Sequence, residues 1–318
     1  MRRTRQEKSK RGWWQAGALA LAASAQCGCF GQTTNFAVTP AADAFVRSLA
    51  PGDNFGAAGA LSVSGSAALN GSGQQNGLFD SLIRFDTADL AASMNNAFGS
   101  NGWVVTGAAL SASEVAAPNN PIFNRGVGAF EIWWIGSDNW VEGSGTPNVP
   151  TTDGVAYQDL ATLLNPAGDV SLGQFTNSGV SGSVSFPLPL AAPLVSNILA
   201  GADLDLYLTA ASASVGFTFN SRNYSLSNAW PSLAVTVAAK PAASISSIEP
   251  SGTDQVTIRF NTASNWTYVL QRLDGLPAGP AAGWSNAFAV APKPFDAQAV
   301  FVDGMTNRQR FYRLVVSP

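Results

Sequence analysis

The sequence predicts an all-β protein that consists of a large β-sandwich followed by a smaller one. Of its 318 residues, 31 are Gly and 18 are Pro, only 12% are charged, and none is His. Short apolar runs alternate with clusters of Gly, Pro, Asn and Ser, which is the spacing typical of sandwich folds. The runs expected as strands of the large sandwich are 36–38, 44–49, 60–63, 78–85, 103–114, 128–135, 170–175, 182–187, 203–210, 216–220 and 232–237.

Three helical segments are expected to interrupt these strands. They cover residues 88–94, with Thr87 as the predicted N-cap, residues 157–164, and residues 191–199, which end at Gly201.

The run 78–85 is apolar at both alternating sets of positions, which favours a central strand covered on both faces. Arg84 is the exception within it. A buried guanidinium is costly unless its donors are fully paired, so we expect a carboxylate or several carbonyl groups around Arg84. Arg47 is a second basic residue inside an apolar run, and we expect it on a neighbouring strand.

A second unit follows a linker. Lys240-Pro-Ala-Ala243 has the composition of a linker, and alternating apolar runs resume after it. We therefore predict an export signal at 1–31, a large sandwich at 33–238, a linker at 239–244 and a small sandwich at 245–318. The runs expected as strands of the small sandwich are 256–260, 268–272, 299–302 and 311–316.

The N-terminal residues have the pattern of an export signal, which predicts a secreted or cell-surface protein. A basic stretch precedes the apolar stretch 13–25, whose last three residues, Ala23-Ser-Ala25, form an A-x-A cleavage site; Phe30-Gly31 is a later alternative. Neither this stretch nor any later one reaches the length of a membrane span. Cys27 and Cys29 lie at the end of the signal, so we expect no disulfide framework; lipidation of Cys27 remains an alternative.

The charge and composition exclude several classes of function. Removal of the signal would leave 11 basic and 19 acidic residues, a net charge of −8 that disfavours nucleic acids and anionic membranes as partners. The lack of His excludes Ser-His-Asp and Cys-His catalysis and most zinc sites. Asp203 and Asp205 share one strand face and are expected in solvent, so no pair of acids in a cleft is indicated for glycoside hydrolysis. The sequence thus predicts a protein that is not an enzyme.

Three motifs carry a resemblance to a known family. They are the strand-turn-strand segment 42–56, the segment Ser81-Leu-Ile-Arg-Phe-Asp86, and Trp140-Val-Glu142. Together they resemble DNRLRE domains, which are secreted bacterial and archaeal β-sandwich domains classed among carbohydrate-binding modules and related to disaggregatase-type surface proteins. The resemblance implies a jelly-roll-like sandwich, and Arg222 matches the Ser-Arg pair that precedes the last strand in many of these domains.

The small unit resembles the Fn3-like sandwiches found at the C-termini of exported planctomycete and verrucomicrobial proteins. Tyr268-Val-Leu-Gln271, Trp284 and Phe311-Tyr-Arg-Leu314 carry this resemblance. It implies that these aromatic residues form a small core.

The segment around Trp140 has two interpretations. Asp138, Asn139 and Glu142 are candidate calcium ligands, because calcium takes six to eight oxygen ligands. In the structural interpretation, which we favour, Glu142 pairs with an internal Arg while Trp140 fills the core. In the turn 53–56, we expect Asn and Gly to supply positive φ angles.

Residues Phe130-Glu-Ile-Trp-Trp-Ile135 hold the strongest candidate for ligand contact. Alternation places Phe130, Ile132 and Trp134 on the core face, so that Trp133 and Glu131 lie on the other. An outward Trp beside a charged group suits stacking against a sugar ring. The alternative is that a loop or helix covers Trp133. The predicted ligand-binding residues are Trp133, Glu131, Arg125 and Tyr224.

The resemblance and these aromatic residues predict non-catalytic binding of an extracellular or cell-envelope polysaccharide. The rival hypothesis is a structural or adhesive surface protein without a specific glycan ligand, and a polysaccharide lyase or hydrolase is the least favoured. No cofactor is expected apart from the candidate calcium.

Overall fold

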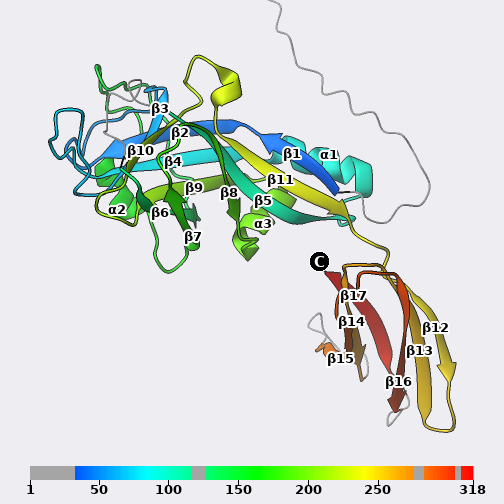
Figure 1. Ribbon diagram of the computed structural model, residues 1–318. Coiled ribbons are helices and arrows are strands. Elements are labelled where there is room, and N and C mark those ends of the chain that lie inside the picture. Colours follow the sequence, from blue (N-terminus) through cyan, green and yellow to red (C-terminus); the bar gives the residue numbers. More distant parts are fainter. Residues whose placement is uncertain (1–32, 116–125, 275–282, 305–308, 318) are drawn as a thin grey trace, which may run out of the picture.

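The computed structural model describes residues 33–115, 126–274, 283–304 and 309–317. These residues form an all-β protein with a few short helices, as the sequence predicts (Figure 1). The strands of the larger part are β1 (Thr33–Val38), β2 (Pro40–Arg47), β3 (Ala60–Ser64), β4 (Phe79–Asp86), β5 (Trp103–Glu114), β6 (Gly128–Ile135), β7 (Val170–Asn177), β8 (Gly182–Leu188), β9 (Asp203–Ala210), β10 (Gly216–Asn220) and β11 (Ser232–Ala239).

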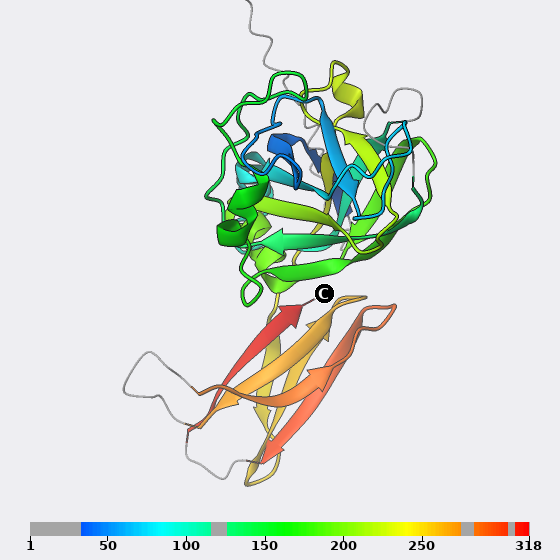
Figure 2. The ribbon, with the colours of Figure 1, turned by 90° about the vertical axis from the view of Figure 1, so that its left-hand side faces the viewer.

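The larger part is a sandwich whose strands pair in antiparallel fashion. One layer has the order β2-β4-β9-β6-β7, and the other has the order β1-β11-β5-β8. The pair β3-β10 connects the layers, since β3 meets β4 through the single pair Ser64–Phe79 and β10 meets β5 through Phe219–Glu114. Figure 2 shows the strands wrapping around one interior.

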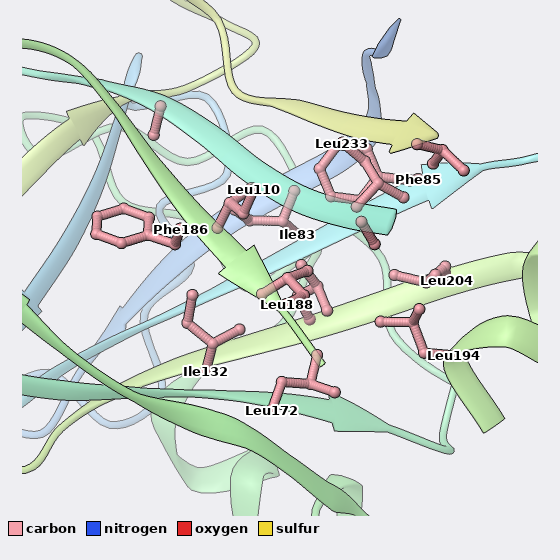
Figure 3. Packing of buried hydrophobic residues seen from close by; sticks show 14 of the residues in the cluster. Ile83, Phe85, Leu110, Ile132, Leu172, Phe186, Leu188, Leu194, Leu204 and Leu233 are labelled. Carbon is pink, nitrogen blue, oxygen red and sulfur yellow. The ribbon is translucent and has the colours of Figure 1, made fainter. Parts of the chain in front are cut away.

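Both layers send apolar side chains into a common core. Leu110, Leu188 and Leu233 face Ile83 and Ile132 across the interior in Figure 3, and all are buried. In β6 the predicted alternation holds, because Phe130, Ile132 and Trp134 all join this core. Burial of this apolar surface is the main stabilising contribution to the sandwich.

A second cluster covers the outer face of β4. Leu82 packs there with Val46 of β2 and with Trp140, and the helical segment after Trp140 closes over them. That segment consists of the 3₁₀ turn Tyr157–Asp159 and α2 (Leu160–Leu163). The two clusters explain why the run 78–85 is apolar at both alternating sets of positions.

The two longer α-helices lie at the edge of the sandwich core. They are α1 (Ala88–Phe98) and α3 (Ala192–Ala200), and α3 ends at Gly201 with φ 67°, as expected. Thr87 occupies the N-cap position of α1 as predicted, but its side chain makes no capping hydrogen bond. Its hydroxyl donates to the carbonyl of Ala202 at 2.7 Å, and Asp86 Oδ1 accepts the Ala88 N–H instead. None of the described helices has the length and apolar character that a membrane crossing requires.

The smaller part is a second sandwich of two three-stranded sheets, ordered β12-β13-β16 and β15-β14-β17 (Figure 1). Phe260, Tyr268 and Leu270 lie at the centre of its separate core. Two of its strands, β12 and β15, were not predicted from the sequence. The strands are β12 (Ile245–Pro250), β13 (Gln255–Thr262), β14 (Thr267–Leu273), β15 (Ser285–Val290), β16 (Ala297–Gly304) and β17 (Phe311–Ser317).

Candidate functional site

Arg84 is paired as the sequence predicts. Its guanidinium Nε donates to Asp205 at 3.0 Å, and its terminal nitrogens donate to the carbonyl groups of Asp138 at 2.6 Å and Trp140 at 3.3 Å. It also lies 4.7 Å from the centre of the Trp140 ring. Its side chain is only 15% exposed. Arg47 lies on β2, which pairs with β4, so these two arginines are on neighbouring strands as expected.

Asp205 is buried, which contradicts the expectation that it lies in solvent. It is 3% exposed and accepts the Arg84 guanidinium and the Trp140 indole N–H at 2.8 Å. Burial raises the pKa of Asp205 to about 6, although the hydrogen bond and charge of Arg84 oppose the shift. The prediction was wrong because strand alternation shows which face of the sheet a residue lies on, but not whether another segment covers that face.

Glu142 follows the structural interpretation rather than the calcium one. One of its carboxylate oxygens accepts Arg222 Nη1 at 2.9 Å, and the other accepts Asn223 Nδ2 at 2.6 Å. Asp138 meets Arg84 through its backbone carbonyl. No group of three or more His, Cys, Asp or Glu side chains among the described residues is arranged to hold a metal.

Asn54 is a buried anchor for the segment around Glu142. Its amide donates to the carbonyl groups of Glu142 at 2.7 Å and Val155 at 2.9 Å, and it accepts the N–H groups of Gly56 and Gly145. The expected positive φ at Asn54 and Gly56 is wrong, since neither residue has one. Gly56 is needed for a different reason: a Cβ there would lie 1.9 Å from the Glu142 carbonyl oxygen.

Trp133 and Glu131 lie on the outer face of β6, as alternation predicts. Trp133 Nε1 donates to Glu131 at 2.9 Å, and its ring packs partly against the cluster around Leu82 and Trp140. The ring is half-buried. Arg125, the third residue predicted for this site, lies outside the described residues.

Tyr224 lies in a different place, on a groove at the end of the sandwich near β3 and β10. The groove has a volume of about 870 Å³, and neither Trp133 nor Glu131 is among its described lining residues. Tyr224 is 37% exposed. We call this hollow the Tyr224 groove; its lining includes Phe45, Arg47, Phe55, Asn76, Phe79, Thr146, Asn148, Thr218, Asn220, Asn223 and Tyr224.

Buried phenylalanine rings form the apolar base of the Tyr224 groove. The rings of Phe45 and Phe55 are stacked with centres 4.9 Å apart, and Phe79 lies 5.5 Å from Phe45. The Arg47 guanidinium lies 5.3 Å from the Phe79 ring and donates to Asn76 Oδ1 at 2.7 Å. Arg47, for which a structural role was predicted, therefore also lines the wall of the Tyr224 groove.

The contacts that hold the Glu142 side chain also hold the segment that forms one wall of the Tyr224 groove. Asn223 donates to the Gly56 carbonyl at 3.0 Å as well as to Glu142, and Arg222 next to it donates its backbone N–H to Asp43 at 2.7 Å. These bonds hold the Arg222–Tyr224 segment in position at the edge of the groove.

The sequence did not identify the amide side chains of this groove. Asn76, Asn148 and the neighbouring pair Asn220 and Asn223 come from three separate parts of the sequence, and the fold brings them together. Asn is common in turns for conformational reasons, so no local pattern marks these four as a group.

The buried carboxyl group of Asp43 should make the stability of the folded protein depend on pH. Burial raises the pKa of Asp43 to about 7, against the opposing effect of the Arg222 N–H, and the charge of Glu142 raises it further. A raised carboxyl pKa means that the folded state holds a proton which the unfolded state releases, so stability falls as pH rises between 3.8 and about 7. The Asp43→Asn variant should show a smaller fall of Tm across this window than the unmodified chain. Equal slopes for the two proteins would contradict this assignment.

Comparisons with known proteins identify no family. No family model matches the chain, and no curated protein matches it. Among solved structures, a calcium-binding mutant of Bacteroides uniformis β-glucuronidase 2 aligns with 90% of this chain at 8% identity and a TM-score of 0.24. This chain spans 28% of that protein's length. Function must therefore be inferred from the site geometry.

Proposed function

We propose that this protein is exported and binds an extracellular or cell-envelope polysaccharide, without cleaving it, in the Tyr224 groove. The observation that carries the proposal is the composition of this groove. It combines a part-exposed aromatic ring, an apolar base and several amide groups, and none of its described lining residues is Asp or Glu.

This composition suits a sugar chain. A sugar ring offers apolar C–H patches, which stack on aromatic rings, and hydroxyl groups, which donate to and accept from amides. Tyr224 supplies the ring, while the exposed Asn148 supplies an amide on the wall. Glycoside hydrolysis commonly uses a pair of carboxylates flanking the scissile bond, and the groove lining supplies none. The motifs that resemble DNRLRE domains support the same proposal.

The outer face that carries Trp133 is the second candidate site in this proposal. The indole N–H of Trp133 donates to Glu131, and the ring is half-buried. Less of the Trp133 face is therefore available to a sugar than in the groove. A matrix or adhesive role without a glycan ligand is the alternative function.

Affinity electrophoresis in gels containing polysaccharide tests both sites. We expect Tyr224→Ala to lower retention by about tenfold, since loss of an aromatic stacking contact costs about 1.5 kcal/mol. Its Tm should stay nearly unchanged, because the Trp230 indole bonds to the Tyr224 backbone and not to its ring.

Two further variants complete this test. Phe295→Ala removes a 60% exposed ring from the small sandwich and should leave retention unchanged. If Trp133→Ala abolishes retention while Tyr224→Ala does not, the ligand binds on the Trp133 face. If the unmodified chain is not retained by any polysaccharide, the matrix role is favoured.

A further inference from the structure

The outer face of the β15-β14-β17 sheet carries a row of polar side chains. Gln271 of β14 lies opposite Asn286 of β15 on one side and Arg313 of β17 on the other. Tyr268 and Leu270 of β14 and Leu314 of β17 join the core, so alternation places Gln271 and Arg313 on the outer face. A register shift between β14 and β15 next to Gln271 brings Asn286 opposite it on the same face. Asn286 and Arg313 are exposed.

The side chains in this row hold one another in position. Gln271 Nε2 donates to Asn286 Oδ1 at 2.8 Å, and Arg313 Nε donates to Gln271 Oε1 at 2.7 Å. The Arg313 guanidinium lies 4.5 Å from the centre of the Trp284 ring. Long polar side chains on an open sheet face normally keep their rotamer freedom, so this ordered row is already prepared for a ligand.

The length of the row and the lack of acidic residues in its strands are compatible with a sugar chain. Neighbouring strands are about 4.8 Å apart, so the three side chains span about 10 Å, which is comparable with the length of a disaccharide. Strands β14, β15 and β17 contain no Asp or Glu, although the whole chain has a net negative charge. Arg313 is exposed, so its guanidinium can donate to a ligand in solvent.

We infer that this face, made of Trp284, Asn286, Gln271 and Arg313, is a second contact surface for a hydroxyl-rich polysaccharide. The inference rests on the proposed function, because it assigns the small sandwich to the same ligand as the Tyr224 groove. Two weak sites on one chain bind a repeating polymer more tightly than either site alone, since the second contact is intramolecular.

The test uses the full chain and a matched pair of double variants. Gln271→Ala combined with Asn286→Ala removes the amides of the row. Asn261→Ala combined with Gln298→Ala removes two paired, exposed amides from the outer face of the other sheet of the same sandwich. We expect the first double variant to weaken retention in polysaccharide gels by about tenfold, which corresponds to two hydrogen bonds of roughly 0.7 kcal/mol each. The second double variant should be retained like the unmodified chain.

The outcomes separate this inference from the proposed function. If the row variant is retained normally while Tyr224→Ala is not, the second surface is wrong and the groove stands. If both double variants weaken retention equally, the loss reflects a general change in the small sandwich and the inference is again overturned. If only the row variant weakens retention, the second surface stands and the groove is not the site. If the unmodified chain binds no polysaccharide, both proposals fail together.

Discussion

Replacing Arg84 with Ala is expected to lower the free energy of unfolding by about 3 kcal/mol or more. The reason is that Asp205 would remain in the interior, 3% exposed, without its cation. The carbonyl groups of Asp138 and Trp140 would lose donors as well, and the Trp140 ring would lose the guanidinium above it. Denaturant unfolding followed by Trp fluorescence measures the change.

A double variant separates the charge effect from lost packing. Arg84→Ala combined with Asp205→Ala removes the unpaired carboxylate together with its partner. We expect this variant to be less destabilised than the sum of the two single variants. A loss below about 1 kcal/mol for Arg84→Ala, which is typical of exposed ion pairs, would show that the pair is not buried in solution.

Replacing Asn54 with Ala is expected to cost about 3 kcal/mol or more, because each buried group left without a partner costs about 1 to 3 kcal/mol. Asn54 is fully buried, and its amide satisfies the carbonyl groups of Glu142 and Val155 and the N–H groups of Gly56 and Gly145. Thermal unfolding with a denaturant series measures this loss.

Asn70→Ala is the matched control for this variant. Asn70 Oδ1 also accepts two backbone N–H groups, those of Ser72 and Gln74, but it does so in an exposed turn. Water replaces those contacts, so we expect a loss below about 1 kcal/mol. Equal losses for Asn54→Ala and Asn70→Ala would contradict the anchoring role of Asn54.

Much of the fold could be predicted because its signals are local. Strands β5, β6 and β9 begin and end at the predicted residues, since alternation and flanking Gly or Asn residues mark them. The pairing of Arg84 was predicted from the cost of burying an unpaired cation. The two unpredicted strands, β12 and β15, are partly exposed edge strands with weak alternation, so their sequences carry little signal.

The candidate site could be predicted only in part, because it depends on contacts distant in sequence. The burial of Asp205 depends on the segment that carries Trp140, 65 residues away. Gly56 is required by a carbonyl group of Glu142 rather than by its own φ angle, and no local pattern shows this. Trp133 and Tyr224 were predicted together from their chemistry, yet the fold places them on different surfaces.

A glycan array probed with residues 32–318, the chain that removal of the predicted export signal would leave, tests the central proposal most directly. The account predicts binding to one class of extracellular or cell-envelope polysaccharide and about tenfold weaker binding by Tyr224→Ala, whose Tm is nearly unchanged. Binding to no polysaccharide on the array, or equal binding by Tyr224→Ala and the unmodified chain, would contradict it.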